Sequence, residues 1–150
     1  MINFTSSLFN QDTFYRAVKR DLVHATKVVV IESPFITRRR VMELLPIFKK
    51  LVDRGVRVII NTKPLEEHNE GMYDQALWSI AQMQDLGASV YMTIGHHRKL
   101  IVVDNKIIWE GSLNVLSQFD SCEFMRRIES EDMALQTIKF LNLDRICKLN

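Results

Sequence analysis

Residues 95–114, GHHRKLIVVDNKIIWEGSLN, contain two aliphatic runs that are separated by a turn sequence and bounded by polar residues. The pattern predicts a β-hairpin over residues 99–111 that turns at Asp104 and Asn105, because these residue types favour tight turns. Continuous aliphatic runs of this kind are typical of strands that are covered on both faces of a sheet. The hairpin therefore predicts a largely buried sheet with helices on either side.

Helical and strand patterns alternate along the rest of the chain. Further strands are expected over residues 27–35, 56–62, 89–94 and 122–130. Helices are expected over residues 11–25, 38–55, 73–87 and 130–150, the last beginning at Ser130 or Glu131. Pro46 is expected to kink the second helix or to split it into two. The alternation predicts an α/β fold, an α/β/α sandwich whose mixed, largely buried sheet is flanked by helices on both faces.

Length and composition limit the class of protein. A chain of 150 residues, 47% hydrophobic and 25% charged, is expected to form one globular domain over residues 1–150. No apolar run reaches membrane-spanning length, and the N-terminus lacks the pattern of a signal peptide. Cys122 and Cys147 lack the spacing of metal ligands, so a reducing, cytoplasmic location is expected. The net charge of +2 is too small to require a nucleic-acid partner by itself.

Polar side chains are predicted to converge at the ends of the hairpin strands. His97 and Lys99 are two residues apart on an extended chain and so project to the same side. Gly-Ser-Leu-Asn at residues 111–114 follows the next strand and turns the chain back toward the same edge. Lysine supplies charge, serine and asparagine supply directional donors, and histidine supplies a nucleophile or a proton. Together these groups predict a site for a phosphate group.

The same residues closely resemble the signature of the phospholipase D superfamily, which is His-x-Lys, four residues, Asp, six residues and Gly-Ser-x-Asn. Every specified position is present at this spacing: His97, Lys99, Asp104, Gly111, Ser112 and Asn114. Glu123 falls, by a looser match, where nuclease members carry a carboxylate that supports the histidine. The order of predicted elements agrees with a family domain over nearly the whole chain. Shorter phrases such as SPFIT at 33–37 look like phospholipase D-like modules that accompany helicases and restriction nucleases.

The resemblance implies phosphodiester hydrolysis in two steps, through a covalent phosphohistidine, without a metal or another cofactor. The resemblance assigns the nucleophile to His97 and binding of the non-bridging oxygens to Lys99 and Asn114, with Ser112 assisting from the turn. It assigns orientation of the nucleophile to Glu123 and structural roles to Asp104 and Gly111. The chemistry needs two histidines from two motifs, whereas the sequence contains one His-x-Lys. The domain is therefore expected to supply half of an active site that a twofold homodimer shares.

Several polar residues also have simpler interpretations. His96 points away from its neighbour on an extended chain and is expected to be structural or peripheral. Gly-Ser-Leu-Asn is compatible with a helix start that Ser112 or Asn114 caps, and Asp104 with a turn former. The arginines are compatible with a solvated surface, and Arg126 and Arg127 alternate, so at most one faces the site. The candidate nucleic-acid contacts are Arg38, Arg39, Arg40, Arg126 and Arg127.

The sequence favours a nuclease over two alternatives. Short members with one motif are mostly nucleases, so the resemblance favours DNA as the substrate and RNA next, with no membrane partner. The first alternative is a non-catalytic nucleic-acid-binding or dimerisation module of a helicase or restriction system. The second is a phospholipid diester hydrolase or transferase. That enzyme would need an exposed apolar surface beside the site, and the sequence has no amphipathic segment suited to the role.

Overall fold

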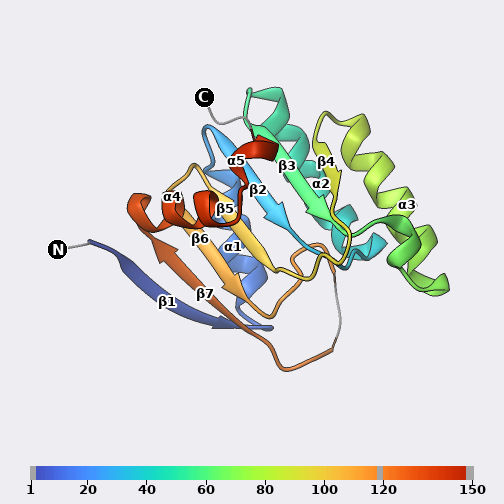
Figure 1. Cartoon of the computed structure of the whole chain (residues 1–150), viewed down its shortest axis with the longest axis horizontal. Helices are drawn as coiled ribbons and strands as arrows, with labels where there is room; N and C mark the ends of the chain where they lie inside the picture. Colours follow the sequence, from blue (N-terminus) through green and yellow to red (C-terminus); the bar gives the residue numbers. More distant parts are fainter. Residues whose placement is uncertain (1–2, 118–119, 148–150) are drawn as a thin grey trace.

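The computed structural model describes residues 3–117 and 120–147. One seven-stranded sheet runs through the molecule, with helices in front of it and behind it (Figure 1). In chain order the elements are β1 (Thr5–Asn10), α1 (Phe14–Val23), β2 (Val28–Glu32), α2 (Arg38–Asp53), β3 (Arg57–Thr62), the 3₁₀ turn η1 (Leu65–Glu67), α3 (Glu70–Asp85), β4 (Ser89–Met92), β5 (Leu100–Val103), β6 (Ile107–Gly111), β7 (Phe124–Glu129), α4 (Glu131–Phe140) and α5 (Asp144–Cys147).

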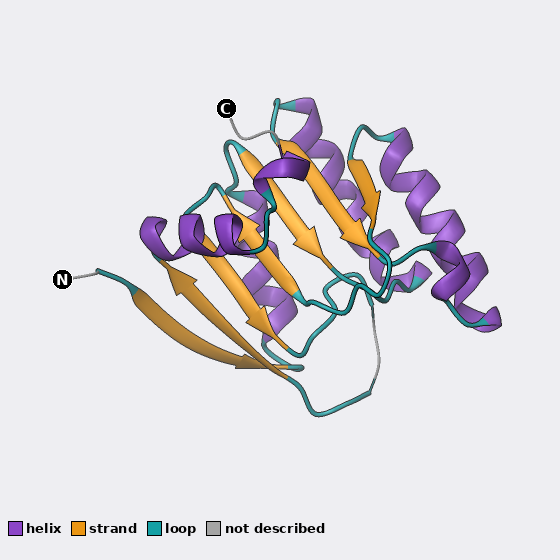
Figure 2. Ribbon diagram, viewed as in Figure 1, coloured by secondary structure: helices purple, strands orange, loops and turns teal. Residues whose placement is uncertain are grey.

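The strands follow the order β1-β7-β6-β5-β2-β3-β4 (Figure 2). β2, β3 and β4 run parallel to one another, and the other neighbouring pairs are antiparallel. The predicted hairpin forms β5 and β6, and β5 pairs with β2 in the centre of the sheet. The mixed sheet with helices on both faces confirms the predicted α/β/α sandwich.

Two apolar layers enclose the sheet. α1, α2 and α3 cover one face, where Phe14 and Leu44 are fully buried against the cluster that contains Ile31. α4 covers the other face, where Ile138 belongs to a second cluster with Val30. Successive residues of β2 thus serve opposite cores, which explains its unbroken β-branched run. Burying an aliphatic side chain of this size contributes about 1.5–3 kcal/mol, so both layers stabilise the central strands.

The N-terminal strand β1 was not expected. It pairs antiparallel with β7 along its whole length, from Thr5 opposite Glu129 to Asn10 opposite Phe124. Its side chains are mostly exposed, so the segment lacks the alternation of apolar and polar residues that predicts a strand. Pairing with a distant part of the chain, rather than local sequence pattern, makes this segment a strand.

The helix α2 corrects the prediction of a split at Pro46. It runs unbroken from residue 38 to residue 53 with the proline inside it. An interior proline removes one backbone hydrogen bond and costs about 3 kcal/mol in an isolated helix. Leu44 and Phe48, on either side of the proline, are fully buried. Packing on both sides of the proline therefore outweighs the local cost.

The predicted single C-terminal helix is two helices. α4 ends at Phe140, and Asn142 adopts a left-handed backbone with φ of 53° before α5 begins. Leu143, in the turn between them, is buried in the same cluster as Ile138. The break thus places an apolar turn residue in the core. Residues 148–150 of the prediction lie outside the described residues.

Candidate active site

His97 and Lys99 lie in the extended segment directly before β5, and the structure brings their side chains together. Nζ of Lys99 lies 3.1 Å from Nδ1 of His97 and donates a hydrogen bond to the His97 carbonyl oxygen at 2.8 Å. The ring of Phe35 meets the imidazole edge-on, with 6.3 Å between the ring centroids. The imidazole is exposed and the lysine is half-buried. The imidazole of His97 and the ammonium of Lys99 thus face the same open space.

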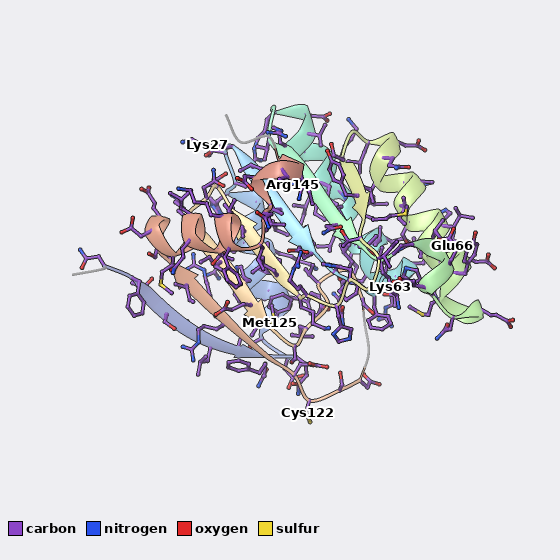
Figure 3. All side chains as sticks on the ribbon, in the orientation of Figure 1. Lys27, Lys63, Glu66, Cys122, Met125 and Arg145 are labelled. Carbon is purple, nitrogen blue, oxygen red and sulfur yellow. The ribbon has the colours of Figure 1, made fainter. Side chains whose placement is uncertain are left out.

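The charge of Lys99 is balanced by a carboxylate. Burial lowers the pKa of the Lys99 ammonium, the Glu123 carboxylate raises it, and the Lys63 ammonium lowers it further, so that the pKa lies below its usual value. The side chain of Lys63 lies over the ring of Phe35, 4.0 Å from its centroid, at the end of β3 (Figure 3). The site therefore holds two ammonium groups close to one carboxylate, which favours an anionic ligand.

Glu123 occupies the loop before β7, together with the exposed free Cys122 (Figure 3). The hydroxyls of Ser112 and Ser121 lower the pKa of Glu123, burial opposes them, and Lys99 adds to the lowering. The Ser121 hydroxyl donates to Oε1 at 2.6 Å. Among the described residues no hydrogen bond joins Glu123 to His97. The contact that the resemblance implies between them is thus not formed in this structure.

Ser112 and Asn114 lie on the turn that follows β6. The Ser112 hydroxyl accepts from the amide of Phe124 at 3.0 Å and donates to the carbonyl oxygen of Phe124 at 3.3 Å. The amide of Phe35 donates to Oδ1 of Asn114 at 3.4 Å, so Asn114 and His97 both contact Phe35. The segment forms a turn and not a helix, so the alternative of a capped helix start was wrong.

Gly111 lies at the end of β6, close to the backbone of β7. Its backbone φ is +155°, which an L side chain rarely adopts. A Cβ at this position would lie 2.9 Å from both Cα and Sδ of Met125, and closer still to the carbonyl oxygen of Phe124. The glycine therefore allows the backbone approach on which the Ser112 turn depends.

Asp104 lies at the far end of β5 and serves the fold. It and Asn105 form the hairpin turn with φ of 53° and 56°. The Asp104 carboxylate accepts hydrogen bonds from the amides of Thr26, Lys27 and Val28 at 2.9, 2.7 and 3.1 Å. The turn is thereby tied to the start of β2. The structure does not bring Asp104 to His97, as expected for a structural residue.

Two of the arginines after Thr37 contact aromatic rings. Arg40 is buried, with its guanidinium 3.4 Å from the ring centroid of Tyr15 and Nη1 2.6 Å from Glu43. The Tyr15 hydroxyl in turn donates to the carbonyl oxygen of Asn114 at 3.1 Å. The guanidinium of Arg38, which is exposed like Arg39, lies 4.2 Å from the centroid of the Trp78 ring. Arg40 therefore packs behind the site and is not available to a bound nucleic acid.

Arg126 and Arg127 face opposite sides of β7. Arg126 donates to the Ser6 hydroxyl at 2.7 Å and lines the groove beside the site. Arg127 is held on the other face by Asp21, with Nε and Nη2 at 2.7 and 2.9 Å from the two carboxylate oxygens. The alternation predicted for this pair thus leaves Arg126 next to the site.

A groove of about 920 Å³ extends from His97, Lys99 and Ser112 along the α4 face of the sheet. The groove is also lined by Phe124, which is 47% exposed, and by Phe140, which is 83% exposed. Sequence analysis missed this surface because its aromatic residues come from β7 and from the end of α4. An exposed apolar groove thus lies directly beside the polar site.

A buried acid, Glu32 at the end of β2, was also not foreseen. It contacts His96 and Arg98, the two neighbours of His97. The one feature of the sequence that could have indicated this acid is its place directly after four β-branched residues, Val28 to Ile31. His96 is buried, as expected for a structural residue.

Comparison with protein families gives one match over most of the chain. The family described as cardiolipin synthase, phospholipase D-like domain, matches residues 18–142. An uncharacterized protein from Streptococcus mutans is 24% identical over 156 residues, which cover 89% of this chain and 33% of that protein. The chain thus spans about a third of the length of this curated relative.

Three solved structures share the fold. Nuc from Salmonella typhimurium, a phospholipase D family member, has a TM-score of 0.76 at 16% identity, with 92% of this chain and 91% of that chain covered. NucT from Helicobacter pylori has a TM-score of 0.67 at 18% identity, with 92% and 93% covered. Phosphatidylserine synthase from Haemophilus influenzae has a TM-score of 0.63 at 14% identity, with 97% of this chain and 39% of that chain covered.

Membrane-spanning helices and clusters of metal ligands are both absent from the described residues. In the described ranges, no helix is long and apolar enough to cross a membrane. Within the same ranges, no three or more His, Cys, Asp or Glu side chains are grouped so that they could hold a metal ion.

Proposed function

The chain belongs to the phospholipase D-like family, and from this premise we propose that it is a metal-independent phosphodiesterase that cleaves nucleic acid, with DNA as the favoured substrate. The observation that carries the proposal is the pairing of His97 with Lys99 at 3.1 Å, in an open space that the Ser112 turn also borders. A nucleophile beside a cation and a hydroxyl suits attack on a phosphate diester.

In the first step a nitrogen of His97 attacks phosphorus. The bond from phosphorus to the leaving oxygen breaks, and a phosphorus–nitrogen bond forms. Lys99 and the amide of Asn114 bind the non-bridging oxygens, whose negative charge increases in the transition state. Ser112 orients the turn and Glu123 keeps Lys99 protonated and in place. Water then attacks phosphorus in the second step, which breaks the phosphorus–nitrogen bond and releases the phosphate.

The leaving oxygen needs a proton, and the attacking water must lose one. A second histidine performs both transfers in this proposal. The chain contains one His-x-Lys, so a second copy of the chain supplies His97 from across a twofold axis. The active site is then shared by a homodimer.

The charges along the groove support a polyanionic substrate. Lys99, Arg98 and Arg126 line it together. Successive phosphates of a nucleic acid are attracted to such a row of cations. The affinity for nucleic acid is expected to fall as the salt concentration rises. The acid Glu110 also lines the groove, between Leu100 and Arg126 in the sheet register.

A phospholipid diester is the second candidate substrate, and the apolar part of the groove favours it. Phe124 and Phe140 provide the exposed apolar surface beside the site that a lipid enzyme needs. The family description and the phosphatidylserine synthase with the same fold point in the same direction. A non-catalytic nucleic-acid-binding module of a helicase or restriction system is the remaining alternative.

An assay with EDTA present throughout separates the three functions. The substrates are plasmid DNA, single-stranded DNA, RNA and vesicles that contain phosphatidylglycerol. We expect cleavage of nucleic acid in EDTA, at a rate that falls with salt, and loss of turnover of more than about 10³-fold in His97→Ala. Lipid turnover without nuclease activity would identify the second candidate. Binding of DNA without turnover of any substrate would identify the non-catalytic module, and activity that requires magnesium would contradict the mechanism.

A further inference from the structure

A buried carboxylate lies behind the segment that carries His97. Glu32 is fully buried, and a buried charge is tolerated where it is paired and hydrogen-bonded. Nε of Arg98 donates to Oε1 at 3.0 Å, and Nη2 donates to Oε2 at 2.9 Å. Nδ2 of Asn61 donates to Oε2 at 3.2 Å. Two parallel bonds from a guanidinium fix both the distance and the plane of the contact.

The same carboxylate also meets the residue on the other side of His97. Nε2 of His96 lies 3.2 Å from Oε2 of Glu32, although not in hydrogen-bonding geometry, and the imidazole is 1% exposed. The backbone before it is fixed as well, since the Thr93 hydroxyl donates to Oδ1 of Asn61 at 2.9 Å. The His96 amide donates to the Thr93 carbonyl oxygen at 3.2 Å. The neighbours of His97 on both sides are thus held toward β2.

This arrangement determines where His97 points. His96 and Arg98 contact Glu32, whereas His97 between them contacts Lys99 and Phe35 instead. His97 is exposed, beside Lys99. Glu32 does not touch the reacting groups, and its effect passes through its two partners.

We propose that Glu32 is a positioning residue that holds His97 at the angle required for attack on phosphorus. The role rests on the proposed phosphodiesterase function. A shift of about 1 Å in a catalytic group costs about 10²-fold in rate, so release of this segment must reduce kcat. Substrate binding depends mainly on Lys99, Asn114 and Arg126, for which Glu32 is not a hydrogen-bond partner.

The test is Glu32→Gln, which keeps the shape of the side chain and removes its charge. We expect kcat to fall about 10- to 100-fold and KM to change less than about 3-fold. The imidazole ¹H–¹⁵N resonances of His97, assigned by their absence in His97→Ala, should shift and broaden. This second measurement requires no turnover.

Asp21→Asn is the matched control, because Asp21 holds Arg127 by the same bidentate geometry and also accepts from Nε1 of Trp109 at 2.8 Å. Asp21 is 11% exposed. It lies on the face of β7 that carries Arg127, opposite the face that carries Arg126. The control should lower the melting temperature while kcat and the His97 resonances stay unchanged. Equal losses of kcat in both variants would show a general effect of stability and would overturn the proposal.

Arg98→Lys covers the case in which Glu32→Gln fails to fold. It keeps a cation beside the buried carboxylate, removes the bidentate contact, and changes a side chain that is 44% exposed. A fall in kcat of about 5- to 50-fold with shifted His97 resonances is expected. Wild-type kcat and unshifted resonances in a folded variant would overturn the positioning role. A wild-type protein without any diesterase activity would instead contradict the proposed function, and the resonances would still decide the role of Glu32.

Discussion

Asp104 shows how one side chain of the family signature serves the fold. Burial raises the pKa of its carboxyl, but the amides of Thr26, Lys27 and Val28 outweigh burial, so that the pKa lies below its usual value. In the unfolded chain the pKa of an Asp carboxyl is about 3.9. Because the pKa of Asp104 is lower in the folded state, its carboxylate stabilises the fold fully at pH values above the unfolded pKa. The contribution is lost as the pH falls through the folded-state pKa.

Asp104→Asn should therefore lower the free energy of unfolding by about 1–3 kcal/mol at pH 7, because three amides lose a charged acceptor. Urea unfolding at pH 7 and at pH 3 checks the expectation, and the difference from wild type should be smaller at pH 3. The control is Asp74→Asn, an exposed acid on α3, which should change the free energy by less than about 0.5 kcal/mol. An equal effect of Asp104→Asn at both pH values would contradict the electrostatic explanation.

His97 and Lys99 needed no tertiary information to be found, since their spacing and the motif around them are local. Glu32 lies 65 positions before His97 in the chain, and only the pairing of β2 with β5 brings the two segments together. Glu123 is intermediate. The sequence identified Glu123 as a candidate and predicted a contact with His97. In the structure Glu123 accepts a hydrogen bond from Ser121 instead, and this contact depends on the conformation of the loop.

At the scale of elements, the contact between β6 and β7 builds the site. Gly111 sits opposite Met125 in the register of the two strands, and the Ser112 turn bonds to the backbone of Phe124. The two strands are joined by a long connection, so the turn is held by strand pairing rather than by a short hairpin loop.

Gly111→Ala should push β7 away from β6, because the added methyl would overlap the backbone of Phe124 and the Met125 side chain. We expect a loss of about 2–4 kcal/mol in the free energy of unfolding, from overpacking and from the positive φ together, and lower diesterase activity. Gly55→Ala is the control. Gly55 has a φ of +85° but open space around the position of a Cβ.

The control should cost about 1–2 kcal/mol from backbone strain alone and leave activity unchanged. Calorimetry and a plasmid assay on both variants separate the two effects. A Gly111→Ala variant no less stable than Gly55→Ala would contradict the close approach of the two strands.

For the whole molecule, the proposed mechanism requires a second copy of the chain to supply half of the active site. The His97 imidazole is exposed just before the start of β5, where a second copy of the sheet can face it across a twofold axis. We expect a dimer by sedimentation at micromolar concentration.

A heterodimer of wild type with His97→Ala, purified by two different tags, tests the shared site. It should be at least about 10²-fold less active than a doubly tagged wild-type dimer, because one histidine for nucleophilic attack or proton transfer is missing. Half of the wild-type activity in the heterodimer, or full activity of a monomer, would show that each chain works alone.

The sandwich, the hairpin and the candidate site residues His97, Lys99, Ser112 and Asn114 could all be predicted from the sequence alone. These features depend on side-chain periodicity and on spacing within 18 residues, which sequence displays directly. Four features became visible only in the tertiary structure: β1 as a strand, the continuity of α2 through Pro46, the contacts of Glu32 with His96 and Arg98, and the apolar groove. Each depends on contacts between residues far apart in the chain. The free energy of such contacts comes from packing and burial, and local sequence pattern does not record which distant partner supplies it.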